Sequence, residues 1–294
     1  MRSLVVSILA LSVVTACSRP SPPPRGAFEA GGDFEPIPKM PYDWLAVRPE
    51  PGQTFEQFVR AKPNRPDARR HKIYLQPIGE FPPGAGPSFK KLQEFTGAFF
   101  QMDVVVRPPL DLSGESITSR KNWPMGHQQL LAGDLLAVLT RQLPADAYAV
   151  LGLTMADLYP DESWNYVFGL ASTRARVGVY SFARYDPRFY GKERTPDWQK
   201  LVLRRSCKVL AHEASHMFGI HHCTFYHCLM NGSNSLEETD MHPLDLCPID
   251  LHKLYHSIGF DVIERYEDLR NFCEGEGFDK EAAWFRRRIE HLSH

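Results

Sequence analysis

The chain has 294 residues, a formal net charge of −1 and 43% hydrophobic residues. The near-neutral charge argues against a nucleic-acid-binding protein, because such proteins usually carry a basic patch or a high isoelectric point. Three of the six cysteines lie beside a histidine-rich segment, where a metal site and disulfide bonds compete as explanations, depending on the compartment.

Residues 1–17, MRSLVVSILALSVVTAC, combine one basic residue, an apolar run too short to cross a bilayer and a small-residue cleavage site. This pattern predicts a secretory signal. The ending VTAC resembles the lipobox of bacterial lipoproteins, in which Cys17 would be acylated, and Ser18 then resembles an outer-membrane sorting signal. We therefore expect an exported lipoprotein whose membrane contact is a lipid at Cys17. An ordinary signal peptide and a cytoplasmic protein are the alternatives.

Residues 18–52 are rich in proline and glycine, which indicates a tether or an arm draped over the domain at 53–294. That domain opens with an expected strand at 73–81 and an expected helix at 88–102, followed by the strand DVVVRPPLDL. A second helix is expected at 126–143, and the apolar runs AYAVLGLTMADLY, WNYVFGLAS and VGVYSFARY are expected to be strands. This order predicts an α/β (α+β) fold with a mixed sheet.

The clearest helical pattern covers residues 195–219, with a cap at its first residue and Gly219 at its end. Cys207 on this helix is expected to be a buried core thiol. Another helix follows LCPID, and one or two more are expected within 261–292, where the arginines of WFRRRIEH indicate a solvated helix face.

The segment HEASHMFGIHH covers residues 212–222. On a helix, residues four apart share a face, so His212 and His216 present two imidazoles to one point. This is the His-Glu-x-x-His arrangement of zinc peptidases. A catalytic zinc takes three protein ligands and leaves a position for water, and Glu213 at the rim of the same face is placed to act as the general base.

The third ligand is expected from the residues that follow. Gly219 can adopt a positive φ and turn the chain back, which brings His222 to the metal and completes the metzincin pattern. His221 is then out of register and should point elsewhere. A glutamate from a later helix, Glu237 or Glu238, is the alternative third ligand. Met230, eight residues past His222, fits the methionine turn of metzincins, although a gap-filling core residue would look the same.

HEASHMFGIHHC, the following CLM and then LCPID at 246–250 together resemble the archaemetzincin (archaelysin) family of zinc peptidases, and the resemblance extends over residues 54–260. It implies a metzincin-like fold with a twisted mixed sheet, an active-site helix and a small C-terminal helical part. By the same resemblance, His212, His216 and His222 are catalytic zinc ligands, and Glu213 is the catalytic base.

The family motif also carries cysteines that hold a second, structural zinc. Here Cys223, Cys228 and Cys247 match, but Asp250 stands where the family pattern has its last cysteine. Since a carboxylate oxygen is an acceptable zinc ligand, we expect a site of three cysteines and Asp250. The competing possibilities are a histidine as the fourth ligand, His227 or His252, and a disulfide between two of the cysteines.

The sequence therefore predicts a lipid-anchored zinc peptidase that cleaves peptides or unstructured protein segments, with one catalytic zinc and a second structural one. Tyr226 or His227 is a possible helper for the oxyanion. The alternative from another class is a zinc-binding surface lipoprotein without turnover.

Overall fold

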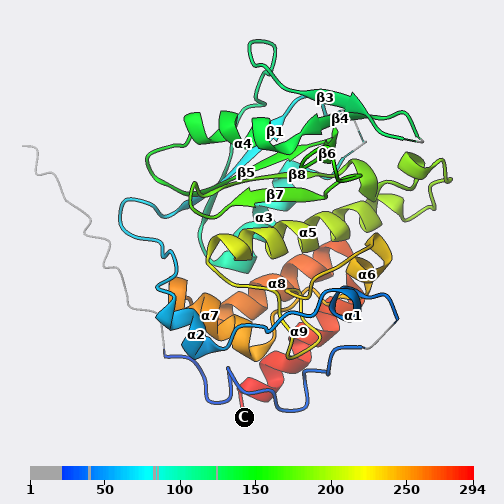
Figure 1. The fold of residues 1–294 in the computed structure, drawn as a ribbon. Helices are drawn as coiled ribbons and strands as arrows, with labels where there is room; N and C mark the ends of the chain where they lie inside the picture. The colour runs from blue at the N-terminus through cyan, green and yellow to red at the C-terminus, as the bar shows by residue number, and fades with distance from the viewer. Residues whose placement is uncertain (1–21, 39–40, 82–83, 85, 124) are drawn as a thin grey trace, which may run out of the picture.

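A computed structural model of the chain describes residues 22–38, 41–81, 84, 86–123 and 125–294 (Figure 1). Cys17 and the rest of the expected signal segment lie outside these residues. Within the described part of the chain, no helix is both long and apolar enough to cross a membrane.

The main sheet has five strands in the order β2 (Asp103–Val106), β1 (Lys72–Ile78), β5 (Ala147–Thr154), β8 (Val177–Ser181) and β7 (Gly169–Ser172). The first four are parallel to one another, and β7 runs antiparallel to β8 at the edge. Every residue of β5 and β8 is buried. Such strands need cover on both faces, and the structure has one hydrophobic core on each side of the sheet. The predicted α/β class with a mixed sheet is confirmed.

A smaller sheet joins β3 (Ser119–Lys121), β4 (Gln128–Leu131) and β6 (Asp157–Tyr159). The prediction of one helix over 126–143 is therefore wrong in its first part, because α4 (Ala132–Arg141) begins only after β4. The reason is tertiary: the buried Gln129 side chain donates to Asp157 Oδ2 at 2.9 Å and so fixes this segment as a strand.

Two long helices lie against the face of the main sheet opposite α4, namely α3 (Phe89–Phe100) and α5 (Trp198–Met217) (Figure 1). Helix α5 begins later than predicted, because the Trp198 N–H donates to the Thr195 carbonyl and closes a separate turn first. The chain leaves α5 through Gly219 at φ +80°, a conformation that glycine adopts without strain. Cys207 is fully buried in the core, as predicted, and burial raises the pKa of its thiol well above the usual value.

Further helices form a layer beneath α5: α6 (Leu236–Met241), α7 (Pro248–Ile258), α8 (Val262–Glu276) and α9 (Asp279–Leu292). The segment 261–292 thus folds as two helices, of which α8 begins at a side-chain cap from Asp261 and ends at Gly277. This layer is the expected C-terminal helical part.

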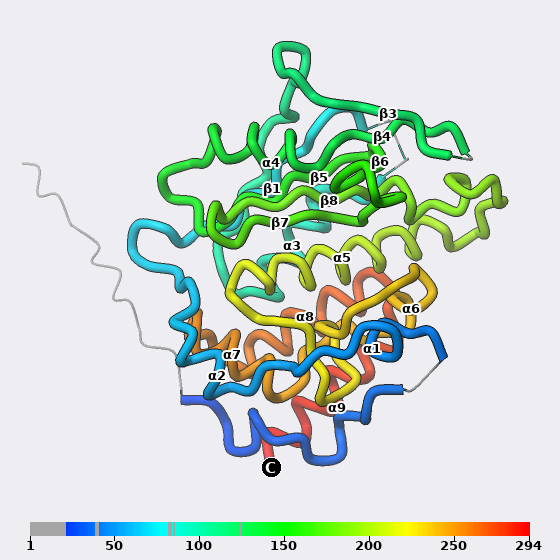
Figure 2. Tube along the Cα trace, viewed as in Figure 1, coloured from blue at the N-terminus to red at the C-terminus, as the bar shows by residue number. Residues whose placement is uncertain are grey.

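The described residues of 22–52, here called the N-terminal arm, run across the lower helices and include the short helix α1 (Trp44–Val47); α2 (Phe55–Arg60) follows (Figure 2). Arg288 of α9 is buried and donates to Asp33 at 2.8 Å and to the Gly26 carbonyl at 2.9 Å. The arm is thus draped over the domain. The expected solvated arginine face is wrong at Arg288, because this arginine holds the arm.

Candidate active site and metal centres

Three imidazoles converge at the end of α5. His212 and His216 lie one turn apart on the helix with their Nε2 atoms 3.1 Å apart, and the His222 ring centroid is 5.3 Å and 5.2 Å from theirs. The three rings can offer ligand atoms within 4.8 Å of one another. Tetrahedral zinc with Zn–N bonds of about 2.0–2.1 Å requires nitrogens about 3.3 Å apart, so this group fits the ion.

Backbone carbonyls orient the two helical histidines. His212 Nδ1 lies 2.8 Å from the Leu229 carbonyl oxygen, and His216 Nδ1 lies 2.6 Å from that of Ile220. A carbonyl only accepts, so each Nδ1 carries the proton and each Nε2 keeps its lone pair for the cluster. Burial lowers the pKa of both imidazoles to about 4, which keeps them neutral, the form that binds a metal.

The turn after Gly219 brings His222 to this group and leaves His221 outside it. His221 is exposed, and its backbone N–H donates to Gln53 Oε1 at 3.3 Å. His222 instead places Nδ1 at 3.0 Å and 3.1 Å from the carboxylate oxygens of Glu50 in the N-terminal arm. Sequence reasoning missed Glu50, because it lies 172 residues away in the chain.

Neither glutamate considered as a third ligand reaches the histidines. Glu238 is buried, and its two oxygens accept the backbone N–H groups of Trp44 at 2.8 Å and Asn234 at 2.6 Å. Glu237 is exposed on α6. Among the described residues, the group that could hold a metal here consists of histidines alone.

The three histidines and Glu213 line one cleft of about 480 Å³. Burial raises the pKa of Glu213, and the neighbouring His216 and His222 partly offset this rise. Aromatic side chains contribute to its lining, namely Trp44 from the arm and Trp164 and Tyr166 from the loop before β7.

The residues expected as helpers are not at the cleft. Tyr226 and His227 are absent from its lining, whereas Lys208 and His242 are present. Burial lowers the pKa of Lys208 to about 7 and that of His242 to about 3. The sequence offered no signal for Lys208 beyond its spacing of four residues from His212 on the same helix.

Met230 is fully buried in the loop that follows the histidines. Its carbonyl accepts the Cys223 N–H at 2.8 Å, and the preceding Leu229 carbonyl holds His212. This loop therefore connects the histidine cluster with a second cluster built on cysteines.

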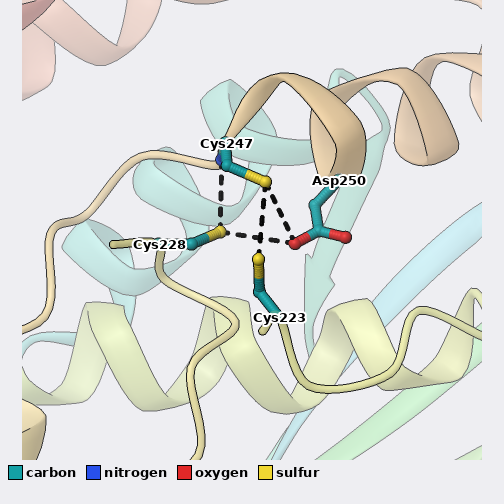
Figure 3. A group of neighbouring side chains, drawn as sticks. All are labelled: Cys223, Cys228, Cys247 and Asp250. Carbon is teal, nitrogen blue, oxygen red and sulfur yellow. Dashed lines mark hydrogen bonds between the residues drawn. The ribbon is translucent and has the colours of Figure 1, made fainter. Parts of the chain in front are cut away.

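Cys223, Cys228, Cys247 and Asp250 converge in the core (Figure 3). The sulfurs of Cys223 and Cys247 are 3.6 Å apart, and Asp250 Oδ2 lies 3.4 Å from the sulfurs of Cys228 and Cys247. Zinc bonds of about 2.3 Å to sulfur and 2.0–2.2 Å to oxygen require separations of about 3.8 Å and 3.6 Å, so the four side chains fit a tetrahedral zinc. The described cysteines form no disulfide.

The first turn of α7 sets the position of Asp250. Its Oδ1 accepts from the buried Lys253 Nζ at 2.8 Å, which leaves Oδ2 facing the sulfurs. Burial raises the pKa of the Asp250 carboxyl to about 7. His227 and His252 are not part of this group, and His252 stacks between Phe28 and Phe55 with ring centroids 4.1 Å and 3.6 Å away.

Comparison with known proteins identifies the family. The model of peptidase family M54 matches residues 138–256. Archaemetzincin-2 of Homo sapiens is 39% identical over 287 residues, which cover 87% of this chain and 79% of that protein. Archaemetzincin-1 of Mus musculus is 37% identical over 278 residues, which cover 85% of this chain and 53% of that protein. The crystal structure of archaemetzincin from Methanopyrus kandleri is 29% identical, covers 65% of this chain and 97% of its own, and gives a TM-score of 0.49.

A mixed sheet above a helix that carries two histidines, together with these relatives, defines a zinc metallopeptidase. The chain belongs to the archaemetzincin family. The predicted family and enzyme class are confirmed.

Proposed function

We propose that His212, His216 and His222 hold the catalytic zinc and that Glu213 is the general base. The observation that carries this proposal is the convergence of the three imidazoles, with Nε2 atoms of His212 and His216 3.1 Å apart, on a cleft that Glu213 also lines. When bound by these residues, a zinc ion would act as a Lewis acid and would lower the pKa of a water molecule to about 7.

Glu213 has the position and the electrostatic environment of a base. It follows His212 directly and faces the same cleft. Its carboxylate accepts a proton from the attacking water and later returns it to the leaving amine nitrogen. Burial raises the pKa of this carboxyl, which favours its acceptance of a proton.

The shape of the cleft favours an extended peptide as substrate. Strand β7 is an edge strand of the main sheet, and Phe168 and Gly169 at its start line the cleft. An extended chain can pair with such an edge through its backbone, while the aromatic walls contact its side chains. We therefore propose peptides or unstructured protein segments as substrates.

A peptide library read by mass spectrometry tests this function. We expect cleavage by the purified protein, loss of cleavage with a chelator and its return on adding zinc. Zinc binding without any cleavage would favour the alternative, a zinc-binding protein without turnover.

We also propose a second, structural zinc on Cys223, Cys228, Cys247 and Asp250. Support comes from the separations of 3.4–3.6 Å between the donor atoms and from the burial of all four side chains. Lys253 adds a buried positive charge beside the acidic ligands. It offsets part of the excess negative charge that three thiolates and a carboxylate would bring to one ion.

The membrane anchor is a proposal from the sequence alone. Cys17 ends an apolar run in the pattern of a lipobox, and we propose that its acylation anchors an exported protein to the outer membrane. Cys17→Ser should then shift the protein out of the membrane fraction or leave it unprocessed. A wild-type protein found in the soluble fraction would rule out the anchor.

A further inference from the structure

We propose that Glu50 of the N-terminal arm is a positioning residue for His222, so that the arm completes the zinc site. This inference rests on the proposed role of His222 as a zinc ligand. Glu50 lies in the N-terminal arm, far from the HEASHMFGIHH motif in the sequence.

The contact between Glu50 and His222 has the geometry of an orienting hydrogen bond. His222 Nδ1 lies 3.1 Å from Glu50 Oε1 and 3.0 Å from Oε2, and both side chains are about three-quarters buried, with 23% and 28% exposed. The carboxylate accepts the Nδ1 proton, and the lone pair on Nε2 is then directed to the histidine cluster.

Glu50 is itself held in place. The Trp44 indole Nε1 donates to Glu50 Oε1 at 2.7 Å, and the Trp44 ring meets the His222 ring edge-on at 5.3 Å and 80°. The backbone N–H of Trp44 in turn donates to the buried Glu238. A hydrogen-bonded chain from α6 to His222 thus runs through two residues of the arm.

The hydrogen-bond partner that orients His222 differs in kind from the partners of His212 and His216. His212 and His216 donate to backbone carbonyls within the loop and turn that follow α5. His222 has a charged side-chain partner from a distant segment. A carboxylate behind an imidazole raises the basicity of the ligand as well as fixing its tautomer. Zinc affinity should therefore depend on the docked arm.

The arm also lines the cleft through Trp44 and Arg48. The Arg48 guanidinium lies over the Trp44 ring at 4.7 Å and over the Trp164 ring at 5.4 Å, so it links the arm to a residue of the loop before β7. The segment that carries Glu50 therefore also contacts the domain through Arg48.

Two substitutions separate the charge of Glu50 from its hydrogen bond. In Glu50→Gln the amide oxygen can still accept from Trp44 and His222, because both contact Oε1, but the charge is lost. Glu50→Ala removes both. Glu29→Gln is the matched control, because Glu29 is an exposed glutamate of the same arm that does not line the cleft of the three histidines. All variants are made in the full chain, and circular dichroism checks that they fold.

The primary measurement is zinc affinity by competition with a chelator, and His222→Ala marks the ion held by the histidines. We expect Glu50→Ala to weaken this ion's binding by about 10- to 100-fold, the usual cost of losing such a partner. Glu50→Gln should weaken it less, and Glu29→Gln should leave it unchanged. Where peptide hydrolysis is measured at saturating zinc, kcat should fall with little change in KM, since Glu50 acts through His222.

The inference would be overturned if both Glu50 variants bound zinc with an affinity within about two-fold of wild type, since a loss of about 10- to 100-fold is expected for such a partner. If Glu50→Ala fails to fold, Glu50→Gln alone decides. The proposed function fails separately: a protein that binds zinc in the expected ranking but cleaves no peptide supports the role of Glu50 and contradicts the peptidase.

Discussion

At the scale of single residues, neighbouring histidines have different surroundings. His222 is partly buried against Trp44 and Glu50, whereas the adjacent His221 is exposed. The positive φ of Gly219 sets which of the two faces the cluster. A side chain at this position would be strained and would also lie 3.2 Å from Pro63 Cβ.

We predict that His222→Ala loses the histidine-bound zinc and peptide hydrolysis, while His221→Ala changes both only slightly. Removing a zinc ligand should lower the zinc affinity by more than the roughly 100-fold that can follow from losing a hydrogen-bond partner of a ligand. Zinc titration of the two variants side by side tests this ranking, and the reverse ranking would show that the other histidine binds the metal.

At the scale of elements, the loop that contains Met230 and the start of α7 together supply the side chains of the cysteine cluster. Cys247 is the N-cap residue of α7, and Asp250 lies in its first turn. Cys223 and Cys228 belong to the loop whose Leu229 carbonyl orients His212. The cysteine cluster therefore supports the histidine cluster through this loop.

We predict that Asp250→Ala releases one zinc per chain and lowers stability, whereas Asp250→Cys retains the zinc and binds it more tightly, because a thiolate replaces a harder oxygen donor. Asp261→Ala is the control. It removes the side-chain cap of α8, at a cost of about 1 kcal/mol, without touching the cluster. Metal analysis after dialysis measures the zinc. Unchanged zinc content in Asp250→Ala would leave Asp250 as a partner of Lys253 only.

The same elements show what could be predicted from the sequence. The helix of His212 and the turn at Gly219 were predictable, because the spacing of their residues is local. The strand at Gln128–Leu131 was not, because its pairing with Asp157–Tyr159 and the Gln129–Asp157 hydrogen bond are long-range. Glu50 was missed for the same reason: nothing near it in the sequence indicates that it contacts His222.

At the scale of the whole molecule, several charges are buried. Asp157 and Arg184 form a bidentate pair at 2.7 Å, and the Arg184 guanidinium lies 3.6 Å from the ring centre of Tyr166 in the cleft wall. Lys208 is buried on α5, and its Nζ donates to the carbonyls of Thr239 at 3.1 Å and Asp240 at 2.8 Å. Because burial shifts the pKa of Lys208 on folding, this lysine makes stability depend on pH.

We predict that Lys208 makes the protein more stable as pH rises between about 7 and 10.5. Burial lowers its folded-state pKa from 10.5 to about 7, so in this window the unfolded chain binds a proton that the folded chain does not. The contribution is at most about 1.4 kcal/mol per pH unit. In urea unfolding across this range, Lys208→Met should lose this slope, and the exposed Lys280→Met should keep it. Parallel curves for wild type and Lys208→Met would contradict the prediction.

The most direct test of the central claim is a zinc titration of the metal-free protein followed by peptide hydrolysis, with wild type and Glu213→Gln measured together. Wild-type hydrolysis should rise in proportion to occupancy of the histidine cluster. Glu213→Gln should bind zinc equally well and hydrolyse about 10² to 10⁴ times more slowly, because an amide cannot accept the proton. Hydrolysis that does not follow zinc occupancy, or a Glu213→Gln variant within a few-fold of wild type, would contradict the proposed mechanism.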